Sequence, residues 1–303
     1  MLSFLPGFIR CALSLIIYFL NSILCVTPLL VFAILKLIIP LKPWQYLSRI
    51  IMDTISTIWV HINSFNLWLM HKIDIKVTGA ELLQKDRWYI VISNHQSWVD
   101  ILVMQKVLLG KIPFLKFFLK KELIWVPVLG LAWWALDFPF MKRYSRNFLE
   151  KNPHLRGKDI EITKKACEKF KTIPVSIVNY VEGTRYTSGK HKKQRSQFTH
   201  LLRPKAGGIG FVLGAMGDMM TGIVNITIAY PDGAKNFGQF LCGQLSTVEV
   251  VIEVVPVSED LLGDYSNDEN YRSYLQSWIN GLWEEKDKKL GMMLGDDDSQ
   301  LLN

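Results

Sequence analysis

The sequence predicts an α/β domain that is preceded by hydrophobic helices. Three observations support this class. Short β-rich runs alternate with helical stretches from about residue 73 onward, a long stretch near the N-terminus carries no charge, and two polar motifs directly follow predicted strands. Hydrophobic residues make up 50% of the 303 residues and charged residues 20%, which excludes a disordered chain and allows a large core.

The strands and helices of the expected domain follow from residue type and periodicity. Runs rich in Val, Ile, Tyr or Thr predict strands at 73–77, 88–93, 172–181, 222–230 and 246–257. Helices are expected between them, at 97–109, 158–171, 206–217 and 267–289. This alternation favours a largely parallel or mixed sheet flanked by helices. We therefore expect the α/β domain at 71–290 and a flexible acidic tail at 291–303.

Residues 1–43 are expected to form a membrane anchor. The 25 residues from Cys11 to Leu35 carry no charge, and about 20 helical residues suffice to cross a hydrocarbon core. A cleaved signal peptide fits less well, because its apolar region spans roughly 7–15 residues and no A-x-A site follows here. A buried helix of a soluble protein is the other alternative. The positive-inside rule places the C-terminal side in the cytoplasm, because three cations follow the stretch: Lys36, Lys42 and Arg49.

Residues 44–70 have a different pattern. Apolar residues recur on one helical face, at Ile51, Ile55, Ile58, Ile62, Phe65 and Leu69. Charged and polar residues, among them Arg49 and Asp53, interrupt the apolar composition. We therefore expect an amphipathic helix that lies in the membrane interface and does not span it. The alternative is an ordinary helix packed on the core of the domain.

Charge and cysteine content limit the possible partners. The net charge of +8 suits nucleic acid, anionic lipid or phosphorylated substrates. No DNA- or RNA-binding motif accompanies the charge, whereas ten Trp favour a membrane interface, so we expect a lipid bilayer and no nucleic acid as partner. The four cysteines lack C-x-x-C spacing: Cys11, Cys25, Cys167 and Cys242. We therefore expect no disulfide framework and no metal site.

The first candidate for chemistry is the segment Asn94–Asp100, which directly follows the predicted strand at 88–93. A helix beginning near Ser97 would place Asp100 in its first turn. His95 could then bond the carboxylate through one ring nitrogen and direct the other outward, as a general base for an alcohol requires. The H-x4-D spacing alone is weak, since it is expected about 0.3 times by chance in a chain of this composition. The alternative is an ordinary loop histidine beside an acid at a helix N-terminus.

Glu182-Gly183-Thr184-Arg185 form a more specific signal, again at the end of a predicted strand. This tetrapeptide is expected only about 0.001 times by chance. Gly183 permits close approach of a ligand to the backbone, and Arg185 can bind a phosphate bidentately. A surface turn with a salt bridge is the alternative.

A third cluster runs from Phe138 to Arg143 and contains apolar residues followed by cations. This pattern suits an acyl chain that enters a site whose mouth binds phosphate. A basic edge of a strand is the alternative.

These motifs, together with Leu201–Gly208 (LLRPKAGG), occur in the order seen in glycerolipid acyltransferases. The chain resembles the PlsC-like 1-acylglycerol-3-phosphate acyltransferases. It is especially similar to bacterial inner-membrane members of the YihG type, over WALDFPFMKRYSR, RGKDIE and SWINGLWEEKDK, so the resemblance covers nearly the whole chain. It implies a glycerolipid acyltransferase fold on an N-terminal membrane helix region, at the cytoplasmic face of a bacterial inner membrane.

The resemblance also implies roles for individual residues. His95 matches the base that deprotonates the acceptor hydroxyl, and Asp100 matches the carboxylate that orients it. Arg143 matches an arginine associated with the acceptor phosphate, as do the third-motif residues Glu182, Gly183, Thr184 and Arg185. Val181 stands where the family usually has Pro, and Asn225–Pro231 (NITIAYP) replaces a Val-Pro stretch, so the acceptor is the less certain substrate.

The expected reaction is transfer of a fatty acyl chain from a thioester to the free hydroxyl of lysophosphatidic acid. Acyl-CoA or acyl carrier protein would serve as co-substrate, without a metal or redox cofactor. Three alternatives stay open: a different lysophospholipid acceptor, a membrane-associated thioesterase or lipid hydrolase, and a non-catalytic binding protein that retains the pocket.

Overall fold

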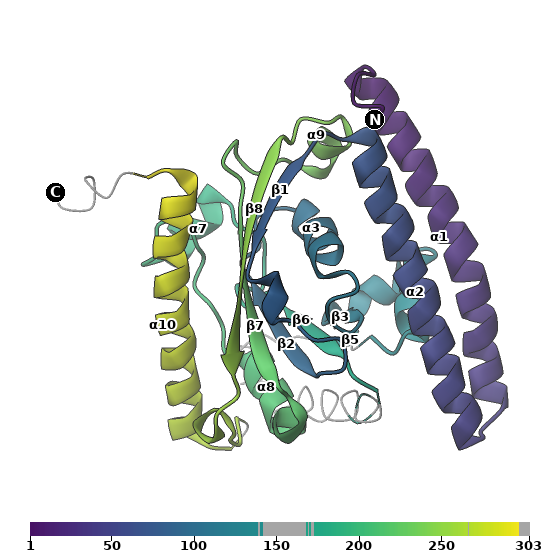
Figure 1. Cartoon of the computed structure of the whole chain (residues 1–303). Helices are drawn as coiled ribbons and strands as arrows, with labels where there is room; N and C mark the ends of the chain where they lie inside the picture. The colour runs from purple at the N-terminus through teal and green to yellow at the C-terminus, as the bar shows by residue number, and fades with distance from the viewer. Residues whose placement is uncertain (139, 142–167, 169, 171–172, 266, 297–303) are drawn as a thin grey trace.

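The computed structural model describes residues 1–138, 140–141, 168, 170, 173–265 and 267–296. A twisted mixed sheet lies at the centre of the molecule. Helices α8 (Gly207–Met216) and α10 (Glu269–Leu294) cover one face, and α3 (Val99–Leu108) lies on the other face, between the sheet and a pair of long N-terminal helices (Figure 1). The mixed sheet flanked by helices confirms the fold class expected from the sequence.

The main sheet has the strand order β1-β8-β7-β2-β6-β3. Its strands are β1 (Asp74–Thr78), β2 (Tyr89–Ser93), β3 (Leu115–Phe117), β6 (Ser176–Asn179), β7 (Gly222–Ala229) and β8 (Thr247–Pro256). β7 and β8 pair antiparallel, and the other neighbours pair parallel. The central strands β2, β6 and β7 are buried along their whole length, as continuous apolar runs in a covered sheet require.

All five expected strands are present, and the described part of the chain also has elements that were not expected. Three of them are strands: β3, and the two strands of a small parallel pair, β4 (Leu119–Lys120) and β5 (Phe140–Met141). The others are the short helices α4 (Leu129–Ala135), α7 (Ser188–Gln194) and α9 (Phe237–Leu241) and the 3-10 turns at Ala80–Leu82, Lys121–Trp125, Gly217–Met219 and Glu259–Leu261. These elements span at most seven residues, too few for a clear periodic pattern.

The helix expected at 158–171 falls almost entirely outside the described residues. The acidic tail does not begin at residue 291, because α10 continues to Leu294. Asp268 caps the start of this helix with its side chain, and Gly295 ends it in the left-handed conformation at φ 78°.

The N-terminal helices α1 (Gly7–Ile38) and α2 (Lys42–Met70) form an antiparallel hairpin along one side of the molecule (Figure 1). Buried amides link them. Asn21 Nδ2 donates to Asn63 Oδ1 at 2.8 Å and to the Trp59 carbonyl at 3.0 Å. Among the described helices, α1 is the one long and apolar enough to cross a membrane, and large apolar side chains along it are exposed, including Phe8, Phe19, Leu24 and Ile34.

The buried face of α2 differs from the apolar face expected from its sequence. The helix buries Met52, Ser56 and Asn63, whereas Ile58 and Phe65 are 48% and 55% exposed. The helix also contacts α3, so one face packs on the domain. The buried face of α2 thus mixes polar residues such as Ser56 and Asn63 with the apolar Met52, while Ile58 and Phe65 face outward. Large apolar side chains that stay exposed on a helix are what a lipid environment favours.

Two ion pairs fasten the helical hairpin to the α/β domain. Lys36 of α1 lies 2.6 Å from Asp137, and both side chains are 12% exposed. Asp53 of α2 lies 3.4 Å from Lys116 of β3, which also donates to the carbonyl of Leu136 at 2.9 Å. Asp53, which interrupts the apolar sequence of α2, therefore has a buried partner across the contact between helix and sheet.

His71, directly after α2, makes folding sensitive to pH. Its ring is 4% exposed and stacks on Phe240 with the centroids 4.9 Å apart, and neither ring nitrogen is hydrogen-bonded to a described protein group. Burial, and secondly the charge of Arg10, lower the pKa of His71 from 6.5 to about 4. Between these values the unfolded chain binds a proton that the folded chain does not, so stability falls as pH falls through this window.

We therefore predict that His71→Phe reduces the acid sensitivity of folding. Wild-type protein should lose about 1–2 kcal/mol more free energy of unfolding than the variant between pH 7 and pH 5. Urea unfolding in detergent at both pH values measures this difference. An equal loss in the two proteins would contradict a neutral buried His71.

Candidate active site

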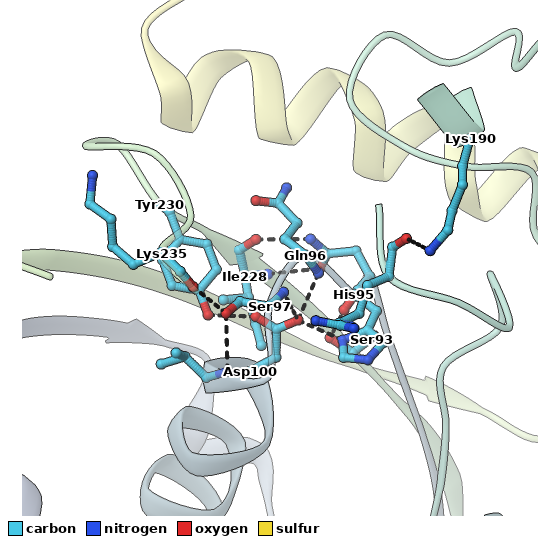
Figure 2. Close-up of polar contacts among 12 residues, drawn as sticks. Ser93, His95, Gln96, Ser97, Asp100, Lys190, Ile228, Tyr230 and Lys235 are labelled. Atoms are coloured by element: carbon cyan, nitrogen blue, oxygen red, sulfur yellow. Dashed lines mark hydrogen bonds and ion pairs between the residues drawn. The ribbon is translucent and has the colours of Figure 1, made fainter. Parts of the chain in front are cut away.

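His95 and Asp100 form a buried pair where β2 meets α3. Ser93 ends the strand, residues 94–98 form the connection, and α3 begins at Val99, so Asp100 lies in the first helical turn. His95 Nδ1 lies 2.8 Å from Asp100 Oδ2 (Figure 2). When Nδ1 carries the proton and donates it to the carboxylate, Nε2 is left with a free lone pair. The structure thus brings together the two residues that the sequence predicted as a dyad.

The Asp100 carboxylate is 1% exposed and accepts hydrogen bonds from several elements. Besides His95, Oδ2 accepts from the backbone N–H groups of Gln96 at 2.7 Å and Ser97 at 2.9 Å. Oδ1 accepts from the hydroxyl of Tyr230 at 2.5 Å, just after β7 (Figure 2). Burial, together with the Asp100 charge, raises the pKa of Tyr230 well above 10 and keeps its hydroxyl a donor. Donors on both oxygens hold the carboxylate in one orientation.

The end of β7 supports the same loop through Asn94. The side-chain amide of Asn94 donates to the carbonyl of Ile228 and accepts from the N–H of Ile228, both at 2.9 Å. The hydroxyl of Ser97 donates to the carbonyl of Lys235 at 2.5 Å. Sequence reasoning missed Asn94 and Tyr230 as functional residues. The available signal was Asn225–Pro231, which was interpreted only as a departure from the family pattern.

A cavity of about 290 Å³ opens beside the dyad. Its wall is almost entirely apolar and comes from the N-terminal hairpin as well as the α/β domain. His95 and Trp98 line it together with Tyr180, whose ring stacks on the imidazole with the centroids 3.9 Å apart. Further lining residues include Cys25, Leu29, Ile55, Trp59, Phe114, Phe117, Trp133 and Phe138. Its apolar lining suits a hydrocarbon chain whose reactive end meets His95.

The third motif lies next to the first. Gly183 has a φ of 71° and donates its N–H to the carbonyl of Tyr180 at 2.8 Å, which turns the chain after β6. The N–H of Tyr186 then donates to the carbonyl of His95 at 2.7 Å. Arg185 is exposed, with its guanidinium 4.9 Å from the centroid of Trp98. The loop therefore places Arg185 beside the cavity residue Trp98 and joins its own backbone to that of His95.

Lys190 of α7 supports this loop and adds a second cation to it. Its ammonium donates to Thr184 Oγ1 at 2.7 Å and to the carbonyl of Arg185 at 2.9 Å. Thr187 caps the helix that carries Lys190. Two cations beside an exposed turn can bind an anionic group by charge-assisted hydrogen bonds.

The structure does not place every predicted residue at the cavity. Glu182 is 1% exposed, is absent from the cavity lining, and interacts with Trp283 and Lys286 of α10. Burial raises the pKa of its carboxyl well above the usual range, and the Lys286 ammonium acts in the opposite direction. Arg143, the remaining predicted site residue, lies outside the described residues.

Residues 74–230 match the family model described as Acyltransferase. The chain belongs to this acyltransferase family. It is 31% identical to human 1-acyl-sn-glycerol-3-phosphate acyltransferase alpha over 121 residues, 40% of this chain and 38% of the human protein. The enzyme of that name from Saccharomyces cerevisiae is 36% identical over 121 residues, 40% of this chain and 35% of the yeast protein. These alignments thus span less than half of the relatives' length.

A solved structure shares the fold over nearly the whole chain. The 1-acyl-sn-glycerophosphate (LPA) acyltransferase PlsC from Thermotoga maritima aligns with a TM-score of 0.54 at 18% identity, and the alignment covers 94% of this chain and 97% of that one. The similarity includes the region of the N-terminal helices as well as the α/β domain.

The hydrogen bond from Tyr230 to Asp100 yields a prediction about stability. Tyr230→Phe should lower the free energy of unfolding by about 1–3 kcal/mol, because it leaves a buried carboxylate oxygen without its donor. Tyr274→Phe is the matched control, since Tyr274 donates to Asp260 but is 41% exposed. Chemical denaturation compares the two. A loss in Tyr230→Phe no larger than in the control would show that this bond does not hold the dyad.

Proposed function

We propose that the protein is a membrane-bound acyltransferase that moves a fatty acyl chain from a thioester donor to the free hydroxyl of lysophosphatidic acid. The observation that carries the proposal is the His95–Asp100 pair at an apolar cavity that can hold the acyl chain. Membership of the acyltransferase family supports the reaction type. The names of the relatives support this acceptor and a role in phospholipid biosynthesis.

The proposed reaction is direct transfer, without a covalent enzyme intermediate. His95 Nε2 takes the proton of the acceptor hydroxyl while its oxygen attacks the thioester carbonyl carbon. The C–O bond forms, the tetrahedral intermediate collapses, and the C–S bond breaks. The imidazolium then gives its proton to the departing thiolate. Asp100 and Tyr230 hold the imidazole in the orientation that this shuttle requires. The donor, acyl-CoA or acyl carrier protein, is a co-substrate, and no metal or redox cofactor takes part.

Two parts of the site suit two parts of the substrates: the apolar cavity suits the acyl chain, and the neighbouring cations suit the phosphate of the acceptor. The cavity excludes water from the acyl chain, and the cations Arg185 and Lys190 lie beside the loop that contacts His95. A lysophospholipid phosphate at these cations would place a glycerol hydroxyl near the imidazole. The mouth of the site thus favours an anionic acceptor over water.

Membrane binding belongs to the same proposal. α1 exposes apolar side chains along its length, and α1 and α2 also form part of the cavity wall, through Cys25, Leu29, Ile55 and Trp59. A lipid-embedded hairpin would deliver acyl chains directly to this wall. The cations in the last turn of α1 and the first turns of α2, Lys36, Lys42 and Arg49, support an orientation with the α/β domain on the cytoplasmic face of a bacterial inner membrane.

An acceptor panel tests the proposed function. Purified protein in detergent is given a labelled acyl thioester with lysophosphatidate, other lysophospholipids or no acceptor, and ester product and free fatty acid are quantified. Phosphatidate should be the main product with lysophosphatidate. Preferential acylation of another lysophospholipid would change the acceptor. Release of free fatty acid at the same rate without acceptor would indicate a thioesterase instead.

Arg185 should act on the acceptor more than on the donor. Arg185→Lys keeps the charge but loses the bidentate geometry, so the KM for lysophosphatidate should rise about 10-fold or more, with a smaller change for the thioester. Initial-rate kinetics with each substrate varied in turn measure this split. Lys192→Ala, at an exposed cation of α7, is the control. An equal rise for both substrates would indicate collapse of the site, and a rise for the donor alone would assign Arg185 to the donor.

A further inference from the structure

The segment from Leu123 to Leu136 consists entirely of Leu, Ile, Val, Ala, Trp, Pro and Gly. It follows β4, begins inside the 3-10 helix Lys121–Trp125 and then forms α4. An apolar run of this length is too short to cross a membrane as a helix, and is typical of a buried core element or of an interfacial segment. The exposure of its side chains distinguishes these two cases.

The outer side of this segment is apolar and exposed. Trp125 is 85% exposed, and Leu131 and Trp134 of α4 are 51% and 43% exposed. Val128, which is also exposed, precedes Leu131 and Trp134 at a spacing of three residues, so the three share one face of the helix. Single exposed apolar residues are common on protein surfaces, whereas a cluster that includes two tryptophans indicates a contact surface.

The backbone holds this surface in a strained and closely packed form. Val128 has a φ of 66° and a ψ of −57°, and the N–H of Leu129 donates to the carbonyl of Pro127 at 2.7 Å. These values describe a γ-turn of the rare, strained kind, and Val128 is a β-branched residue at positive φ. A Cβ on Gly130 would lie 2.1 Å from the carbonyl oxygen of Ile124, so glycine is required where α4 packs on the preceding turn. A strained turn that presents apolar side chains outward is expected at a binding surface.

The inner side of the same segment faces the acyl cavity and α1. Leu129, Ala132 and Trp133 line the cavity. Ala132 also belongs to the apolar cluster that contains Ala33 of α1. Ile34, next to Ala33 in α1, is exposed. The exposed side of α4 therefore lies beside the exposed apolar side of α1.

Three features of this surface favour a lipid bilayer as its partner. Tryptophan is enriched where proteins meet the headgroup region of a membrane. Lys120 and Lys121, both exposed, precede the segment and outnumber the exposed Glu122, which suits anionic headgroups. The surface also adjoins α1, which among the described helices is the one long and apolar enough to cross a membrane.

We propose that Trp125 and the outer face of α4 enter the bilayer as a second docking element, beside the N-terminal hairpin. The inference rests on the proposed function for its catalytic consequence. One face of α4 would contact lipid while the other lines the acyl cavity, so a single short helix would separate the two. The reaction would then take place at the depth of the lysophospholipid headgroups, and the acceptor would not have to leave the membrane.

Quenching of a fluorescent probe tests the docking without any turnover. Trp125→Cys, Leu24→Cys on α1 and Tyr274→Cys on α10 are made in a background whose four native cysteines are replaced by alanine, and each is labelled with NBD. All three positions are exposed. The labelled proteins are bound to vesicles of phosphatidylethanolamine and phosphatidylglycerol, which contain either a lipid with a quencher on its acyl chain or no quencher and added aqueous iodide. The probes at 125 and 24 should lose at least about half of their emission to the lipid quencher and little to iodide, and the probe at 274 should do the reverse.

The three probes separate the possible outcomes. Quenching by iodide at 125, with quenching by lipid at 24, would overturn the inference and leave the hairpin as the membrane anchor. Protection of the probe at 125 from both quenchers, with a dimer in light scattering, would assign the surface to a second copy of the chain and would also overturn it. Should the cysteine-free protein not fold, Trp125→Phe decides. Brominated lipid should then quench a smaller fraction of the tryptophan emission than in wild type, and an unchanged fraction would count against docking.

Kinetics in two environments give a second measurement. The double variant Trp125→Ser/Leu131→Ser changes residues that do not line the cavity. It should transfer acyl groups to lysophosphatidate in vesicles at least about fivefold more slowly than wild type, and to the same acceptor in detergent within about twofold of the wild-type rate. Tyr274→Ser is the control and should change neither rate. An equal loss in vesicles and detergent would indicate a structural role instead of docking. If wild-type protein transfers no acyl group, the proposed function fails while the quenching result still decides the docking.

Discussion

The structure depends on how the buried carboxylate of Asp100 is satisfied. A buried carboxylate is tolerated only when donors surround it, and here the donors come from the β2–α3 connection and from the residue after β7. These contacts require the ends of β2 and β7 and the start of α3 to meet at one point. The pairing of Asn94 with Ile228 joins the same elements a second time. Satisfying one carboxylate therefore also fixes the ring of His95.

The two faces of the sheet serve different ends of the reaction that we propose. On the face towards α3, the N-terminal hairpin and the α/β domain together line the apolar cavity. The ion pairs Lys36–Asp137 and Asp53–Lys116 hold the hairpin against the domain. On the opposite face, α8 and α10 cover the sheet, and the loop at 182–186 joins His95 through the bond from the Tyr186 N–H to the His95 carbonyl. The dyad lies between the two, because His95 lines the cavity and its carbonyl accepts a hydrogen bond from the loop at 182–186. A membrane hairpin that forms part of the cavity wall would make lipid binding and acyl binding inseparable.

Much of this organisation could be predicted from the sequence, and the remainder has physical reasons. The five longer strands and the helices α3, α8 and α10 have enough residues for a period to be visible, and His95–Asp100 is a local pair that a strand end and a helix start bring together. The bond from Tyr230 to Asp100 joins residues 130 positions apart, so no local pattern reveals it. The orientation of α2 was also not predictable from its apolar stripe, because the buried face includes Ser56 and Asn63 while Phe65 of the stripe is exposed. Asp53 looked like an interruption of an apolar helix, and only the structure shows its partner, Lys116 of β3.

The central claim is that His95, oriented by Asp100, removes the proton from the acceptor hydroxyl. Single-turnover transfer from a labelled thioester to lysophosphatidate, measured with wild type, His95→Ala and His191→Ala, tests it most directly. His191 hydrogen-bonds the carbonyl of Phe198 and is absent from the cavity lining, so it controls for loss of a histidine. The account predicts that His95→Ala slows ester formation by about 10²–10⁴-fold and still folds and binds membranes, while His191→Ala retains most activity. Ester formation by folded His95→Ala at more than a few per cent of the wild-type rate would contradict it.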